Sequence, residues 1–143
     1  MPVATAPAPR VHGHFLAAEV GELAGVSGTT IGQWARWGYI RSSASDAEPR
    51  GYSVEDVAEA AIVGELLRRG VSHADVRRAI MRLGEEDGPW PLSDAPLGTA
   101  VVRGRTRVVL RERDGCYLLT PRGWQLMTAP PPVDEVRLRL SRG

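Results

Sequence analysis

In the first half of the chain, apolar residues recur every three or four positions, which is the spacing of one buried helical face. Glycines at Gly25, Gly38 and Gly70 interrupt this pattern, and glycine is the residue that most easily adopts the left-handed conformation at the end of a helix. The pattern predicts four helices, at residues 17–24, 28–37, 53–69 and 72–83.

Serines at the predicted helix starts support these boundaries. Ser27 suits the N-cap of the second helix, because its hydroxyl can accept a hydrogen bond from a free backbone N–H. Ser53 with Asp56, and Ser72 with Asp75, each form a Ser-x-x-Asp sequence, a variant of the capping box with Asp in place of Glu or Gln. We therefore expect both later helices to begin at a reciprocal side-chain cap.

Two regions show strand patterns instead. A short strand at 39–41 and a return strand at 50–52 flank a polar turn, as in a hairpin. After a Gly- and Pro-containing boundary at 84–91, apolar residues alternate with polar ones, which predicts strands. We expect strands at 107–112 and 116–119 joined by a tight turn at Asp114–Gly115, a helical turn from Thr120 to about Met127, and a last strand at 136–140.

These elements predict an α+β fold. An N-terminal winged helix-turn-helix, with four helices and a small β wing, precedes a small antiparallel β-rich C-terminal segment. The expected organisation is a disordered lead-in at 1–13, the helix-turn-helix domain at 14–84, a linker at 85–95 and a small dimerisation or partner-binding domain at 96–143.

Composition narrows the function. All 18 basic residues are arginine, whose planar guanidinium suits phosphate, although the formal net charge is only +1. The single cysteine and the absence of a long apolar run favour a reducing, cytoplasmic location away from membranes. Glycine-rich phosphate loops, nucleophile elbows and ligand-spaced Cys/His sets are missing from the sequence. We therefore expect no enzyme activity, no metal and no cofactor.

A helix, a short turn with glycine and a second helix form the pattern of a DNA-binding helix-turn-helix, whose second helix enters the major groove. Gln33 can read adenine through a bidentate pair, and Thr29 can reach a base or a phosphate. The predicted DNA-binding residues are Ser27, Gly28, Thr29, Thr30, Gly32, Gln33 and Arg36 on this helix, and Arg41, Arg50 and Tyr52 on the hairpin.

Three segments in order resemble MerR-type regulators: residues 19–40 (EVGELAGVSGTTIGQWARWGYI), residues 50–57 (RGYSVEDV) and residues 67–72 (LRRGVS). The resemblance spans about residues 15–83, over half of the predicted structured chain. It implies that Arg50 touches DNA phosphates and that Thr29 and Gln33 face the groove.

The chain also departs from that family. Gly32 stands where the family usually has arginine, Ala35 where it has an acid, and Gly21 where a small alanine is usual. The long helix of the family's coiled coil and a metal-sensing cysteine cluster do not follow residue 83. A MerR-like head on a small β-rich tail is similar to some bacterial antitoxins.

The sequence leaves the role of the C-terminal segment open. On one continuous strand, the arginines from Arg103 to Arg113 at odd positions share a face, which is either a basic stripe for a partner or an ordinary solvated face. Partner-binding candidates are Arg103, Arg105, Arg107 and Trp124, while Trp90, Trp124, Leu126, Met127 and Val136 can form a small core or a dimer patch.

Two functions follow from the sequence. The first is a transcriptional regulator that binds a palindromic duplex operator as a homodimer. The alternative is an antitoxin whose residues 91–143 bind a toxin protein while the protein represses its own promoter.

Overall fold

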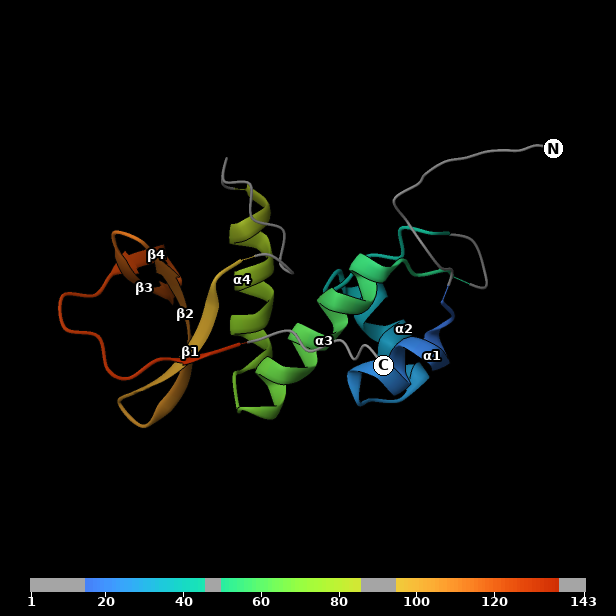
Figure 1. Ribbon diagram of the computed structural model, residues 1–143, viewed down its shortest axis with the longest axis horizontal. Helices are drawn as coiled ribbons and strands as arrows, with labels where there is room; N and C mark the ends of the chain where they lie inside the picture. Colours follow the sequence, from blue (N-terminus) through green and yellow to red (C-terminus); the bar gives the residue numbers. More distant parts are fainter. Residues whose placement is uncertain (1–14, 46–49, 86–94, 137–143) are drawn as a thin grey trace. The chain divides into compact units, whose positions relative to one another are not determined.

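The computed structural model describes residues 15–45, 50–85 and 95–136 (Figure 1). Several predictions lie outside these residues: the lead-in at 1–13, the hairpin tip at 46–49, the linker residues 86–94 and the strand residues 137–140. The chain forms two compact units that divide at Ala61 and Ile62, within one helix. Among the described residues, no helix has the length and hydropathy needed to span a membrane.

The first unit contains α1 (Ala17–Ala24), α2 (Gly28–Trp37) and the beginning of α3 (Val54–Arg68) (Figure 1). The predicted bounds of α1 and α2 are confirmed, and α3 begins one residue after its capping Ser53. Its core combines apolar residues of all three helices with aromatic residues from the connecting segments: Val20, Ile31, Trp34, Tyr39, Tyr52 and Val57.

Close contact between α1 and the turn before α2 depends on Gly21. A Cβ atom at this position would lie 2.4 Å from the backbone oxygen of Val26, which no side chain can tolerate without a shift. The N–H groups of Gly25 and Val26 both donate to the Gly21 backbone oxygen, so the turn closes directly on α1. This arrangement explains why glycine replaces the usual alanine here.

The predicted strand at 39–41 is wrong. The Tyr39 N–H donates to the Trp34 backbone oxygen and closes the end of α2, and the N–H groups of Arg41 and Ser43 donate to carboxylates of α3. With these donors already paired, the segment follows α3 instead of forming a ladder. The β pairing is limited to isolated bridges, Ser45 with Gly51 and Phe15 with Tyr52.

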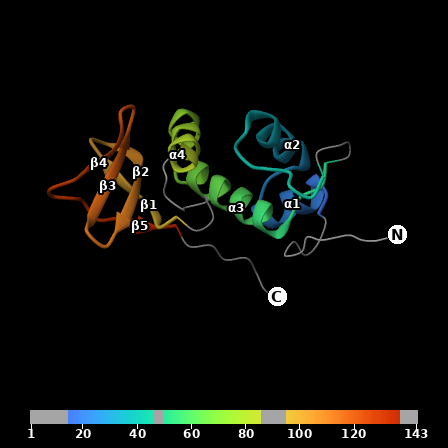
Figure 2. The same cartoon turned by 90° about the horizontal axis from the view of Figure 1, so that it is seen from above.

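The second unit begins with the last turns of α3 and continues with α4 (His73–Glu85), which extends two residues beyond the predicted end. Five strands form one antiparallel sheet in the order β4-β3-β2-β1-β5, and α4 packs against β2 and β3 (Figure 2). The strands are β1 (Leu97–Val102), β2 (Arg105–Glu112), β3 (Gly115–Thr120), β4 (Gly123–Leu126) and β5 (Asp134–Glu135).

The helical turn predicted after Thr120 is wrong, because the chain reverses there. The Thr120 hydroxyl donates to the Gly123 backbone oxygen and accepts from the Arg122 N–H, which closes a tight turn and returns the chain as β4. Strand β1 was not predicted, since its first four residues are all buried and show no alternation. The continuous strand expected from Arg103 is also interrupted, because Arg103 has a φ of +55° in the turn between β1 and β2.

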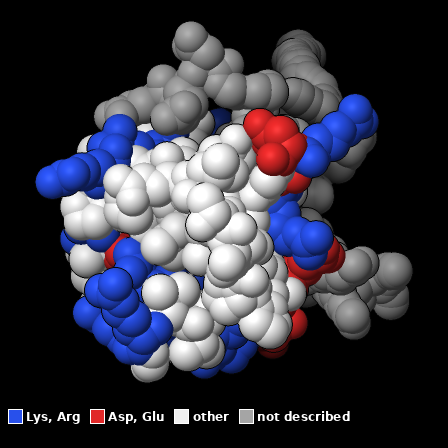
Figure 3. Space-filling model, turned by 90° about the vertical axis from the view of Figure 1, so that its left-hand side faces the viewer, with Lys and Arg blue, Asp and Glu red and all other residues white. Residues whose placement is uncertain are grey.

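Residues 127–133 connect β4 to β5 and contain no charged side chain. Met127 and Val133 pack against a small cluster of sheet residues, Ala100, Val109 and Cys116. Figure 3 views this side of the molecule: its centre is uncharged, and both arginines and acidic residues lie around the margin. At the other end of the connection, the Arg69 guanidinium donates to the backbone oxygens of Asp134 and Glu135 and so attaches β5 to the end of α3.

Candidate nucleic-acid interface

Helix α2 begins at a side-chain cap. The Ser27 hydroxyl oxygen accepts a hydrogen bond of 3.0 Å from the Thr30 N–H, and the two hydroxyl groups of these residues are also 3.0 Å apart. Gly28 faces α1, since a Cβ atom there would lie 3.1 Å from the Cα of Ala18. Ser27, Gly28 and Thr30 therefore shape the start of the helix, while Thr29 is exposed beside them.

The outer face of α2 carries three polar side chains at helical spacing. Thr29, Gln33 and Arg36 stand four and three residues apart, and they are exposed or half-buried, whereas Ile31 and Trp34 are buried. Gly32 leaves space on this face: the nearest atom to a Cβ built there is an Arg36 guanidinium nitrogen at 3.8 Å. The Arg36 guanidinium thus lies beside the position where the sequence lacks an arginine.

A salt bridge attaches the loop after α2 to α3. The Arg41 guanidinium donates to a Glu59 carboxylate oxygen at 2.6 Å, and the Arg41 backbone N–H lies 3.3 Å from the other oxygen. The Glu59 side chain is 6% exposed, while that of Arg41 is 64% exposed. The carboxylate is therefore enclosed, and the guanidinium is held at the surface.

Asp56 performs a second attachment one helical turn earlier. Its Oδ2 atom accepts from the Ser43 N–H at 2.7 Å, from the Ser43 hydroxyl at 2.8 Å and from the Ser53 N–H at 2.8 Å. The Asp56 N–H donates to the Ser53 hydroxyl, which confirms the predicted capping box. Asp56 is fully buried, and its bonds from Ser43 attach the loop that carries Arg41 to the start of α3.

Burial and pairing act in opposite directions on the Glu59 carboxyl. Burial raises the pKa of Glu59, and the hydrogen bond from Arg41 opposes this effect without cancelling it. The same hydrogen bond is the main reason that the pKa of Arg41 is raised. Arg41 therefore stays charged at any physiological pH.

A hollow of about 420 Å³ lies between the end of α2 and this loop. Ala35 and Ile40 contribute to its wall, together with Ser42, Ser43 and two arginines, Arg41 and Arg50. Two guanidinium groups at one open hollow suit an anion such as a phosphate. The structure thus brings together Arg41 and Arg50, which the sequence placed on opposite strands of a hairpin.

The prediction of Tyr52 as a DNA-binding residue, in contrast, is wrong. Tyr52 is fully buried and its backbone pairs with Phe15, so its side chain belongs to the core and cannot reach a duplex. Sequence reasoning also missed Glu59, because nothing in a local pattern distinguishes this acidic residue from its exposed neighbour Glu55. For Asp56 the Ser-x-x-Asp pattern indicated the cap but not the contact with Ser43.

The predicted partner-binding residues of the tail lie at different places in the second unit. Arg105 is exposed on β2, and Arg103 is exposed in the preceding turn. Arg107 is half-buried, where its guanidinium donates to Asp75 and to the Leu119 backbone oxygen. Trp124 is half-buried on β4, and its indole nitrogen is buried without a hydrogen-bond partner among the described residues.

Two helices joined by a three-residue turn, the second capped by serine and exposed on one polar face, define a helix-turn-helix domain. Residues 16–83 match the family described as MerR HTH family regulatory protein, so this N-terminal part of the chain is a MerR-type helix-turn-helix domain. The match confirms the predicted resemblance and supports a DNA-binding regulator at the level of the family. No curated protein and no solved structure matched the chain significantly.

Proposed function

We propose that this protein is a transcriptional regulator that binds duplex DNA through α2 and the loop that carries Arg41 and Arg50. The observation that best supports the proposal is the Arg41 guanidinium, which is mostly exposed yet held by an enclosed carboxylate beside a second arginine. An arginine fixed in this way loses little conformational freedom when it contacts a phosphate.

In this proposal the exposed face of α2 reads bases. Gln33 pairs with adenine in the major groove, Thr29 contacts a base edge or a phosphate, and Arg36 takes the place of the arginine that is missing at Gly32. Arg41 and Arg50 contact the phosphates flanking the helix, and they set position and affinity more than sequence preference.

We further propose that the protein binds a palindromic operator as a homodimer, since two copies of such a domain match two half-sites. A protein with this role acts in the cytoplasm, where the chromosome lies, and needs no catalytic residues, metal or cofactor.

A gel shift with the DNA upstream of its own gene tests the proposal. Wild-type protein should give a salt-sensitive shift at low ionic strength, Arg50→Ala should weaken it by about tenfold, and Gln33→Ala should reduce discrimination between operator and unrelated DNA. Arg113→Ala, which removes an exposed arginine from the second unit, is the control for the loss of one positive charge. The proposal fails if no shift forms, or if Arg50→Ala behaves as wild type.

An antitoxin remains the alternative, and it rests on the resemblance of a MerR-like head with a β-rich tail. A small neighbouring gene that overlaps or abuts this one would favour it, and an isolated gene would favour a regulator alone. Co-expression of the full chain with that neighbour, followed by a growth assay, tests the alternative directly: no relief of toxicity would remove it.

A further inference from the structure

A second hollow, of about 320 Å³, lies in the second unit between α4 and the turn that joins β3 to β4. Its wall is formed by Ala74, Arg77, Arg78, Met81, Arg82 and Pro121. Three of these six residues are arginines and none is acidic, so the hollow presents positive charge from one helix face. Nothing in the proposed DNA contacts of the first unit uses it.

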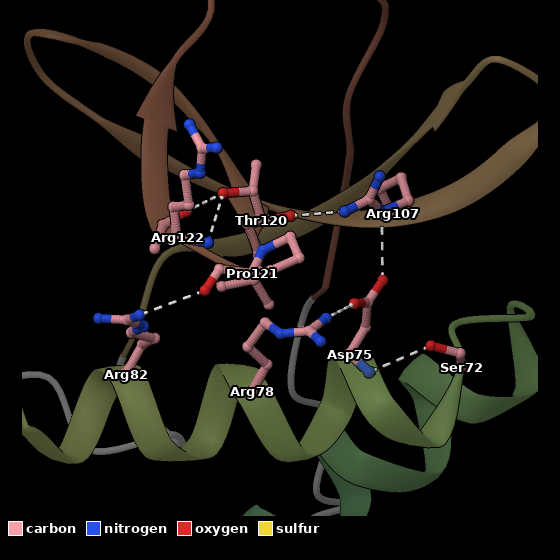
Figure 4. A network of polar contacts seen from close by, with 10 residues as sticks. Ser72, Asp75, Arg78, Arg82, Arg107, Thr120, Pro121 and Arg122 are labelled. Carbon is pink, nitrogen blue, oxygen red and sulfur yellow. Dashed lines mark hydrogen bonds and ion pairs between the residues drawn. The ribbon is translucent and has the colours of Figure 1, made fainter.

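Two of the hollow's three arginines, Arg78 and Arg82, are held by contacts within the fold (Figure 4). Arg78 donates to the Asp75 carboxylate at 2.6 Å, and the other oxygen of that carboxylate accepts from Arg107 at 3.1 Å. Arg82 donates to the Pro121 backbone oxygen at 3.4 Å, and its guanidinium carbon would lie 3.5 Å from a Cβ atom at Gly123. One buried carboxylate therefore serves two arginines, which leaves an excess of positive charge in fixed positions.

Met81 gives the hollow an apolar component. Its side chain is 55% exposed on α4, beside the uncharged Ala74 and Pro121. A flexible thioether at the surface adapts to apolar groups of different shapes, and a phosphate backbone has no such group to offer. The pairing of fixed guanidinium groups with an exposed methionine fits a ligand that carries carboxylates next to an apolar side chain.

We propose that this hollow binds an acidic segment of a partner protein, with carboxylates on Arg77, Arg78 and Arg82 and an apolar side chain on Met81. Guanidinium and carboxylate groups form charge-assisted hydrogen bonds, and the preformed positions of Arg78 and Arg82 reduce the entropy lost on binding. The proposal is independent of DNA binding by the first unit.

The test uses the full chain and a labelled twelve-residue peptide that contains glutamates around two leucines. Fluorescence anisotropy should show binding of this peptide and none of a matched peptide with glutamines. Arg77→Glu should weaken binding by about tenfold or more, and Met81→Ser by about threefold. Arg113→Glu, an equal change of charge at an exposed site on the β2–β3 turn, should change the affinity less than about twofold.

Several results would overturn the proposal. Wild-type protein that fails to bind the glutamate peptide, or equal losses in Arg77→Glu and Arg113→Glu, would show that the hollow is not a specific site. Loss of duplex binding in Arg77→Glu with unchanged peptide binding would assign the surface to nucleic acid, and loss of self-association would assign it to a second copy. Thermal unfolding of each variant controls for folding, and Met81→Ser retains the test if Arg77→Glu is unstable.

Discussion

Both units contain a Ser-x-x-Asp sequence at the start of a helix, but its aspartate has different partners in each. In the first unit, Ser53 and Asp56 bond reciprocally, because the Asp56 N–H donates to the serine hydroxyl and the Ser53 N–H donates to the carboxylate. In the second unit, the Asp75 N–H donates to the Ser72 hydroxyl, but the Asp75 carboxylate pairs with Arg78 and Arg107 instead. Both carboxylates are buried.

The residue three positions further along each helix explains part of the difference. Asp56 is followed at that spacing by the acidic Glu59, whereas Asp75 is followed by Arg78. On a helix, residues at this spacing are neighbours, so an arginine attracts the carboxylate and an acid does not. The shared pattern thus determines where a helix begins, and the charges around it determine which part of the fold the carboxylate stabilises.

Replacing Asp56 should have the largest effect. Asp56→Ala removes the acceptor of the buried Ser53 N–H and of the part-buried Ser43 N–H, although the Ser43 hydroxyl keeps its bond to the Ser53 hydroxyl. The free energy of unfolding should therefore fall by about 3 kcal/mol. Urea denaturation measures this free energy of unfolding. Glu55→Ala, at an exposed neighbouring position, should change the free energy by less than about 0.5 kcal/mol. A loss below that of Glu55→Ala would contradict the buried attachment of the loop.

Replacing Asp75 should have a smaller effect, of about 2 kcal/mol, because Arg107 retains its hydrogen bond to the Leu119 backbone oxygen and Arg78 is partly exposed. The double variant Asp75→Ala with Arg107→Met should recover part of this loss, since the half-buried charge is removed with its partner. The same denaturation assay compares them. No recovery would show that Asp75 stabilises α4 by its local cap alone, as the sequence pattern predicts.

Glu59 should give the smallest effect and a distinctive pH dependence. Burial raises its pKa in the folded protein above the ordinary value of 4.5, so its contribution to stability is full below that pH and is lost as pH rises through the folded pKa. Relative to Glu59→Gln, wild-type protein should therefore become less stable as pH rises above about 4.5. Parallel curves of unfolding free energy against pH for the two proteins would contradict this.

Helices were predictable because their signals are local. The apolar spacing and the serine caps located all four helices within two residues. Strands depended on distant partners. The first four residues of β1 are all buried and show no alternation, and β4 follows a turn that the Thr120 hydroxyl closes and that resembles the start of a helix. The segment at 39–41 had the composition of a strand, but the Tyr39 N–H donates to the Trp34 backbone oxygen and the Arg41 N–H donates to Glu59.

The same division applies to the candidate DNA-binding residues. Thr29, Gln33 and Arg36 share a face because helical spacing alone puts them there. Tyr52 was misplaced because its pairing with Phe15 joins residues far apart in the chain, and the Arg41–Glu59 salt bridge spans 18 positions. Contacts of this kind join distant parts of the chain, so no pattern among neighbouring residues predicts them.

The salt dependence of DNA affinity shows whether Arg41 and Arg50 form a phosphate-binding pair beside α2. Fluorescence anisotropy with a labelled duplex from the upstream region gives log affinity against log salt concentration for wild type, Arg41→Ala, Arg50→Ala and Arg113→Ala. The slope should fall by about one unit in each of the first two variants and stay unchanged in the third. Identical slopes in all four proteins, or an affinity that does not depend on salt, would contradict it.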